Sequence, residues 1–146
     1  MRIRRRRVTI SEAYEFLESI RRTEAEIIKL QLRHDELRSC LLPEGIRYDI
    51  DRVQSSPSDR MSDIEAQIVD IARDIQRMKE EKAKLIIKVN NAINNLSDDN
   101  EQIVLLAYYV GRLPVKRIME ITHYTRTGVY YVRKRAVKHL AEICTN

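Results

Sequence analysis

Apolar residues recur along two long stretches of the chain at alternating steps of four and three. In residues 9–41 this stripe consists of Phe16, Ile20, Thr23, Ile27, Leu30, His34, Leu37 and Leu41. In residues 62–96 it consists of Ile64, Ile68, Ile71, Ile75, Met78, Lys82, Leu85, Val89, Ala92 and Leu96. This is the heptad spacing of helices that pack along one seam. The pattern predicts two long helices, and the charged Lys82 is a polar seam position of the kind that fixes register or partner number.

A loop and two helix starts are predicted around these stripes. Residues 42–61 hold two of the three prolines and the run SSPSD, which favours a loop. Ser11 is the expected cap of the first helix, and Ser58, Asp59 or Ser62 would start the second. The two helices most simply form an antiparallel, coiled-coil-like hairpin over residues 9–97, although the same stripes could pair between chains. We expect a homo-oligomer, because a two-helix hairpin buries only one narrow stripe per helix.

The last third of the chain, residues 98–146, has the pattern of three shorter helices. The expected core positions of the first two helices are Ile103, Leu106 and Val110, then Leu113, Val115, Ile118 and Ile121. The first helix would end at a left-handed Gly111. A tight turn over residues 122–124 precedes a third helix, which Thr125 can cap through its hydroxyl. The core positions of that third helix, at steps of three, four and four, are Val129, Val132, Ala136 and Leu140.

The other side of this third helix carries hydroxyls, phenols and cations. The residues that fall there are Arg126, Thr127, Tyr131, Lys134 and Lys138. All three chemical types can bond base edges or phosphates, so the helix over residues 125–141 is expected to read the major groove of double-stranded DNA. Residues 111–140 contain eight Lys or Arg against one acid, which is the charge distribution of a phosphate-binding face.

A second basic block opens the chain. It consists of Arg2, Arg4, Arg5, Arg6 and Arg7. One interpretation is a solvated tail over residues 1–8 that increases solubility. The other is a DNA-binding arm of the kind that reaches into a groove. No apolar segment follows the arginines, so a signal peptide is not predicted.

Composition favours helices and limits the classes of function. The chain has 43% hydrophobic and 34% charged residues with one Phe, no Trp and three Gly, which is typical of an all-α protein. Cys40, Cys144 and the histidines lack metal-ligand spacing, so we expect no metal, no cofactor and no disulfide. No Gly-rich phosphate loop or Ser-His-Asp set is present, which argues against an enzyme. No stretch approaches the roughly 18 apolar residues of a membrane span, so we expect a soluble, cytoplasmic, nucleoid-associated protein.

The C-terminal segment resembles region 4 of the sigma-70 superfamily. The shared features are a helix-ending Gly111, a central Ile118 in an amphipathic helix, the hydroxyl cap Thr125, and the run Arg135-Ala136-Val137. The chain as a whole resembles small phage-encoded, ArpU-like transcriptional regulators. Their helical N-terminal part carries a loop similar to YDIDRVQSSPSDRMSD, which stands here at residues 48–63. The resemblance implies a helix-turn-helix that follows a helical N-terminal region.

Several positions depart from the pattern of that family. His123 stands where the turn usually holds Gly, so it must accept a positive φ or the turn must differ. Gly128 lies in the first turn of the recognition helix, where it would allow close approach of the backbone to DNA. Lys116 and Arg117 stand in a helix that is often acidic, which weakens the case for usual polymerase binding and strengthens phosphate contact.

The resemblance also implies roles for individual side chains. The residues implied to contact bases are Arg126, Thr127 and Tyr131. Those implied to contact phosphates are Tyr130, Arg112, Lys116 and Arg117. Those left to face the DNA backbone or a protein partner are Arg133, Lys134, Arg135 and Lys138. Tyrosines at helix junctions are usually half-buried, and the three to which this applies are Tyr108, Tyr109 and Tyr124.

These features predict a sequence-specific DNA-binding transcriptional regulator of a phage or mobile genetic element, with host RNA polymerase as a candidate partner. The chain has no room for the promoter-melting region of a true sigma factor. An alternative is a phage terminase small subunit, which also joins a helix-turn-helix to oligomerising helices, commonly in the opposite order. A further alternative is an interaction module whose basic helix binds an acidic protein partner.

Overall fold

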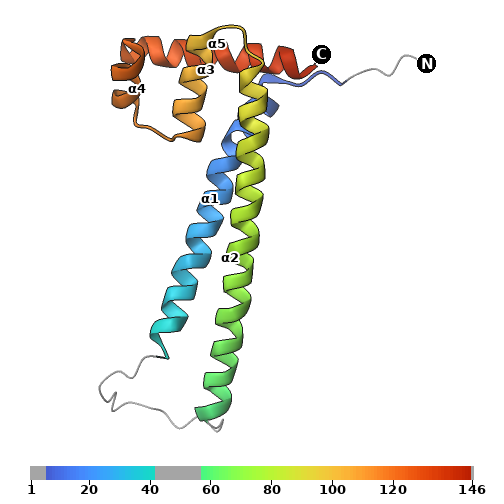
Figure 1. The fold of residues 1–146 in the computed structure, drawn as a ribbon, viewed down its shortest axis with the longest axis vertical. Coiled ribbons are helices and arrows are strands. Elements are labelled where there is room, and N and C mark those ends of the chain that lie inside the picture. Colours follow the sequence, from blue (N-terminus) through green and yellow to red (C-terminus); the bar gives the residue numbers. More distant parts are fainter. Residues whose placement is uncertain (1–5, 42–56, 146) are drawn as a thin grey trace, which may run out of the picture. The chain divides into compact units, whose positions relative to one another are not determined.

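The computed structural model describes residues 6–41 and 57–145, and in this part of the chain it is all-helical without strands. The elements are α1 (Ile10–Ser39), α2 (Pro57–Asn94), α3 (Asp99–Leu105), the π-helical turn η1 (Leu106–Val110), α4 (Val115–Thr122) and α5 (Arg126–Thr145) (Figure 1). The predicted all-α class is therefore confirmed. The second long helix begins at Pro57, one residue before the first of its three expected starts, Ser58, Asp59 and Ser62. Of the loop predicted over residues 42–61, residues 42–56 lie outside the described residues.

The first helix begins with a reciprocal pair of side-chain contacts. The Glu12 backbone N–H donates to the Thr9 hydroxyl at 3.1 Å, and the Thr9 N–H donates to the Glu12 carboxylate at 2.9 Å. This capping box satisfies two amides that helix geometry leaves without partners. Thr9 is thus the cap, and the expectation that Ser11 caps the helix was wrong. These contacts also hold the pKa of Glu12 below its usual value, chiefly through the Thr9 backbone N–H.

The heptad stripes predicted for the two long helices are confirmed as the less exposed faces of α1 and α2. Every residue of both stripes is buried or half-buried, including Lys82. Burial along the stripes is uneven, however. Ile20, Val89 and Leu96 are almost completely buried, whereas Leu37 and most other stripe positions between residues 23 and 81 are only half-buried.

The chain divides into two compact units that cut across both long helices. The core unit comprises the chain up to Arg22 and from Lys82 onward, and the two-helix unit comprises Thr23–Glu81. This grouping differs from the expected division after residue 97, because the start of α1 and the end of α2 contribute to the same apolar cluster as α3, η1 and α5. That cluster contains Ala13, Leu17, Ile20, Val89, Ile93, Leu96, Leu105, Tyr109, Ala136, Val137, Leu140 and Ala141.

The two-helix unit has a much thinner interior. Its buried apolar residues, among those described, are Ile27 from α1 and Ile71 from α2. Large apolar side chains are exposed on the same segments, including Leu32, which is 66% exposed. A seam between two helices without a third layer covers only part of each side chain, which accounts for this pattern.

The segment that links α3 to α4 differs in detail from its prediction. Gly111 has φ −74°, and the left-handed residue is its neighbour Arg112, with φ 51°. The expectation of a left-handed Gly111 was therefore wrong. The Gly111 N–H donates to the Leu106 carbonyl at 2.7 Å, so η1 ends on a widened turn. Ile103 is 41% exposed, and the residues buried in its place are Val104, Leu105 and Tyr109.

Three residues connect α4 to α5, and two of them, His123 and Thr125, behave as the sequence predicts. His123 adopts the left-handed conformation with φ 59°, which confirms that this position accepts a positive φ. The Thr125 hydroxyl accepts from the Gly128 N–H at 3.0 Å, which confirms Thr125 as the cap of α5. Ile118 is fully buried, but Ile121 is 46% exposed, so its predicted core position was wrong. The four predicted core positions of α5 are confirmed as buried.

Candidate nucleic-acid interface

The outward face of α5 presents six polar or basic side chains to solvent. They are Arg126, Thr127, Tyr130, Tyr131, Lys134 and Lys138, and all six are exposed. At about 100° per residue these positions fall within an arc of about 140°. The opposite face is buried against the two neighbouring helices α3 and α4. We call this surface, defined by the six residues, the outward face of α5.

Further cations stand immediately before and within α4. Arg112, Lys116 and Arg117 are all exposed. The Arg117 guanidinium lies 2.8 Å from the Glu120 carboxylate, an exposed i,i+3 pair that water screens strongly. The core unit therefore offers cations from two successive segments, which is the charge arrangement that a polyanionic ligand requires.

Arg133 lies apart from the outward face of α5. Its guanidinium carbon is 4.5 Å from the centroid of the Tyr108 ring and 5.3 Å from that of Tyr130. Its Nε is buried without a hydrogen-bond partner in the described part of the chain. Both distances are within the range of cation–π attraction, so the guanidinium of Arg133 interacts with both rings. Arg133 thus contacts the exposed Tyr130 from within the same helix.

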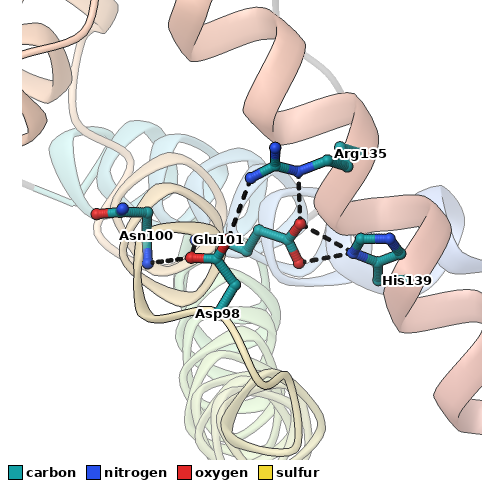
Figure 2. Close-up of polar contacts among 5 residues, drawn as sticks. All are labelled: Asp98, Asn100, Glu101, Arg135 and His139. Atoms are coloured by element: carbon teal, nitrogen blue, oxygen red, sulfur yellow. Dashed lines mark hydrogen bonds and ion pairs between the residues drawn. The ribbon is translucent and has the colours of Figure 1, made fainter.

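Arg135 belongs to a cluster of charged side chains that joins α3 to α5 (Figure 2). Its Nε donates to Glu101 Oε1 at 2.7 Å, and a terminal nitrogen lies 3.1 Å from Asp98 Oδ2. His139 Nδ1 lies 2.8 and 2.9 Å from the two oxygens of the same Glu101 carboxylate. Glu101 is only 2% exposed, so its charge is stabilised by these partners rather than by water.

The same cluster connects the helix cap to the outward face. Asp98 accepts from the Asn100 N–H at 2.9 Å and thereby caps α3 (Figure 2). The Arg135 guanidinium lies 5.8 Å from the centroid of the exposed Tyr131 ring. The hydrogen bond to buried Glu101 raises the pKa of Arg135 above its usual value. Arg135 therefore has a structural role in joining α3 to α5, and the contact with DNA or a partner that the resemblance implies stays a prediction.

Sequence reasoning missed Glu101 and His139 as members of this cluster. One local signal was present, because Asp98 and Glu101 stand three residues apart at a helix start, the spacing of a capping box. Asp98 does cap the helix, but Glu101 bonds to residues of α5. The partners of Glu101 depend on which side chains of α5 lie close to it, and the spacing of residues around Glu101 carries no information about this.

The tyrosines divide into packing and exposed residues. Tyr109 is buried, and Tyr108 and Tyr124 are half-buried, so the predicted packing roles are confirmed. The Tyr108 and Tyr109 rings form an edge-to-face pair with centroids 4.8 Å apart. Burial raises the pKa of Tyr109 to about 12. Tyr131 is 65% exposed and remains accessible to a ligand.

Gly128 has a packing reason within the protein. A Cβ at this position would stand 3.2 Å from Thr125 Oγ1 and 3.3 Å from Tyr124 Cβ. Both distances are tighter than ordinary van der Waals contact. A side chain here would require these neighbours to shift by a few tenths of an ångström, so the glycine eases packing of the first turn of α5 against the preceding turn. The close approach to DNA stays a prediction.

Other kinds of site find little support in the described residues. Within them no group of three or more His, Cys, Asp or Glu side chains is arranged to hold a metal ion. Cys40 and Cys144 are free and exposed. No helix in the described ranges is long and apolar enough to cross a membrane.

Residues 44–141 match the model of a family described as a protein of unknown function, DUF1492, and the chain belongs to that family. The match includes α2 and most of the following helices. Comparison with curated proteins found no match, and comparison with solved structures found none either.

Proposed function

We propose that the protein is a sequence-specific DNA-binding transcriptional regulator. In this proposal α4 and α5 form a helix-turn-helix of the sigma-region-4 type, and α5 lies in the major groove. The observation that carries the proposal is the outward face of α5, where exposed cations, hydroxyls and phenols stand opposite a fully apolar buried face. Arginine pairs with guanine and hydroxyls pair with several bases, so such a face can discriminate sequences.

One feature of the site supports recognition of specific bases, and a second supports orientation of the helix on the duplex. Tyr130 and Tyr131 are exposed, yet each is backed by a guanidinium at 5.3 and 5.8 Å respectively. Restricted side chains lose less entropy on binding, and their fixed geometry penalises a wrong base more strongly. Arg112, Lys116 and Arg117 would supply phosphate contacts that orient the helix on the duplex.

The proposal extends to the assembly of the protein. The first two helices would form an antiparallel hairpin that pairs with a second copy, because its seam is only half-buried in one chain. A homo-oligomer would then present two reading helices to two half-sites. The protein would act at a promoter of a phage or mobile element in the bacterial cytoplasm, with or without contact to RNA polymerase.

The test begins with selection of a preferred site from random duplexes. Arg126→Ala is expected to weaken binding of the selected site by about 1–3 kcal/mol and to relax preference at one base pair. Lys134→Ala should weaken selected and random duplexes alike, and lower the slope of log K against log salt by about one unit. Lys79→Ala, which removes an exposed cation from the two-helix unit, is the matched control.

The outcomes separate specific reading from simple charge attraction. If selection yields no preferred sequence, or if Arg126→Ala and Lys79→Ala behave alike on selected and random DNA, the reading role of α5 is wrong. Footprinting of bound genomic sites in the host then tests regulation. Sites upstream of transcription units support the proposal, and sites confined to a DNA-packaging locus contradict it.

A further inference from the structure

The chain segment before α1 is attached to the last turn of α5. The Val8 backbone N–H donates to the Thr145 hydroxyl at 3.0 Å, and that hydroxyl in turn donates to the Ala141 carbonyl at 2.8 Å. The next residue, Thr9, starts α1 with its capping box. Arg6 and Arg7, the described residues just before Val8, therefore lie at the C-terminal end of the proposed reading helix.

This attachment brings Arg7 close to the outward face of α5. Arg7, Val8, Lys138, Glu142 and Thr145 line one open hollow of about 460 Å³. Lys138 is the last cation of the outward face, so Arg7 continues that surface beyond it. Glu142 contributes a single carboxylate to the same hollow, against the two cations.

Arg6, the residue before Arg7, is also held at this end of the core unit. Its guanidinium pairs with the Glu12 carboxylate, and its side chain remains 86% exposed. Three further arginines precede it in the sequence, at positions 2, 4 and 5. The two carboxylates named at this end, Glu12 and Glu142, are fewer than the five arginines of this sequence block, which favours an anionic partner.

We propose that Arg6 and Arg7 form a second DNA-binding site, which contacts backbone phosphates of the duplex beside the segment that α5 reads. This inference rests on the proposed function, since it requires α5 to lie on the same duplex. A guanidinium matches phosphate geometry and can bind it with two parallel hydrogen bonds. Anchoring at Val8 keeps the arginines near the duplex, so their contacts cost less entropy than those of a free tail.

The chemistry of this site sets its effect on binding. Phosphate contacts carry no direct sequence information, so Arg6 and Arg7, together called the arm, increase affinity for all duplexes by a similar factor. Each phosphate contact contributes about 0.9 to the slope of log K against log salt. The arm should therefore alter salt dependence and leave sequence preference unchanged.

The central experiment compares two double variants with the same loss of charge. Arg6→Ala/Arg7→Ala is expected to lower the salt slope by about one to two units and to weaken selected and random duplexes equally. Arg38→Ala/Arg73→Ala removes two exposed arginines from the two-helix unit and should leave the slope within experimental error. Circular dichroism of each variant verifies that the fold is retained.

A third variant tests the anchor without changing any charge. Thr145→Val removes the oxygen that accepts from the Val8 N–H, and Thr145→Ser retains it. Thr145→Val should lose part of the affinity that Arg6 and Arg7 provide, whereas Thr145→Ser should bind as the unaltered chain does. Shortening the duplex at one flank of the selected site should remove the same contribution.

The results distinguish this inference from the proposed function. If the two double variants have the same salt slope while Arg126→Ala loses the selected site, the arm is refuted and the reading role of α5 stands. If the unaltered chain binds no duplex at any salt concentration, both proposals fail. A loss of sequence preference in Arg6→Ala/Arg7→Ala would show base contact, and would overturn the assignment to phosphates.

Discussion

The core unit and the two-helix unit are built from the same two long helices, yet they differ sharply in how well their apolar stripes are covered. In the core unit, the stripe positions Ile20, Val89 and Leu96 are almost completely buried because α3, η1 and α5 pack over the ends of α1 and α2. In the two-helix unit the stripe continues with the same spacing, but Ile27 and Ile71 are its only buried apolar residues among those described. A heptad pattern therefore specifies which face of a helix turns inward. Whether further helices pack over that face determines how completely its side chains are buried.

This difference separates the roles of the two units. The core unit contains the outward face of α5, the charged cluster around Glu101, and its own apolar interior. The two-helix unit has an incomplete interior and several exposed large apolar residues, such as Ile28 and Val69. We expect the first to fold as a unit and the second to depend on association with another chain.

The largest expected effect comes from cutting the chain between α2 and α3. A fragment of residues 97–146 would lose Leu17, Ile20, Val89 and Ile93 from its apolar cluster. With about half of a small core removed, we expect this fragment to be unfolded by circular dichroism. By contrast, replacing Thr23–Glu81 with a flexible Gly/Ser linker should leave a cooperatively folded protein. A cooperative thermal transition in the short fragment would show that the two compact units are divided incorrectly.

The next largest effect compares one substitution at two positions of α1. Leu17→Ala, at a fully buried site in the core unit, should lower the free energy of unfolding by about 2–5 kcal/mol. Leu32→Ala, at a site 66% exposed in the two-helix unit, should change it by less than about 0.5 kcal/mol. Both values come from urea denaturation at several protein concentrations. A large, concentration-dependent effect of Leu32→Ala would instead show that a second copy covers this residue.

A smaller difference in folding free energy is expected between substitutions in a buried and in an exposed ion pair. Glu101→Gln leaves Arg135 and His139 facing a neutral amide, and should cost about 1–3 kcal/mol of folding free energy. Glu26→Gln disrupts the exposed pair with Lys29, 2.8 Å long, and should cost at most about 0.5 kcal/mol. Comparable losses for the two variants in urea denaturation would mean that Glu101 is well solvated and that the cluster in Figure 2 does not clamp α3 to α5.

The smallest expected effect is a pH dependence confined to the core unit. Burial raises the pKa of Tyr109 from 10.0 to about 12, so the folded protein retains this proton at a pH where the unfolded chain releases it. The resulting stability is complete below about pH 10 and is lost as the pH rises toward 12. Tyr109→Phe should therefore lose less stability than the unaltered protein between these values. Parallel pH profiles of the two proteins would show that Tyr109 is accessible to solvent.

Features that depend on one or two helical turns were predictable from the sequence. The inward and outward faces of α5 follow from side-chain spacing, and the structure confirms both. Thr125 caps α5 and His123 takes a positive φ because each depends on its immediate neighbours. One local prediction was wrong: Ser11 and Thr9 are both acceptable caps of α1, and only the Glu12 carboxylate favours Thr9.

Features that join distant segments were decided only by the tertiary structure. Glu101 and Arg135 are 34 residues apart, and either could have been a solvated surface charge. Arg133 was expected to face DNA or a partner, yet its guanidinium interacts with the rings of Tyr108 and Tyr130, because η1 brings Tyr108 beside α5. Local spacing fixes which side of a helix is apolar, since it depends on the turn angle alone. The polar groups that contact that helix are determined by packing between elements that are distant in the sequence, so only the tertiary structure shows them.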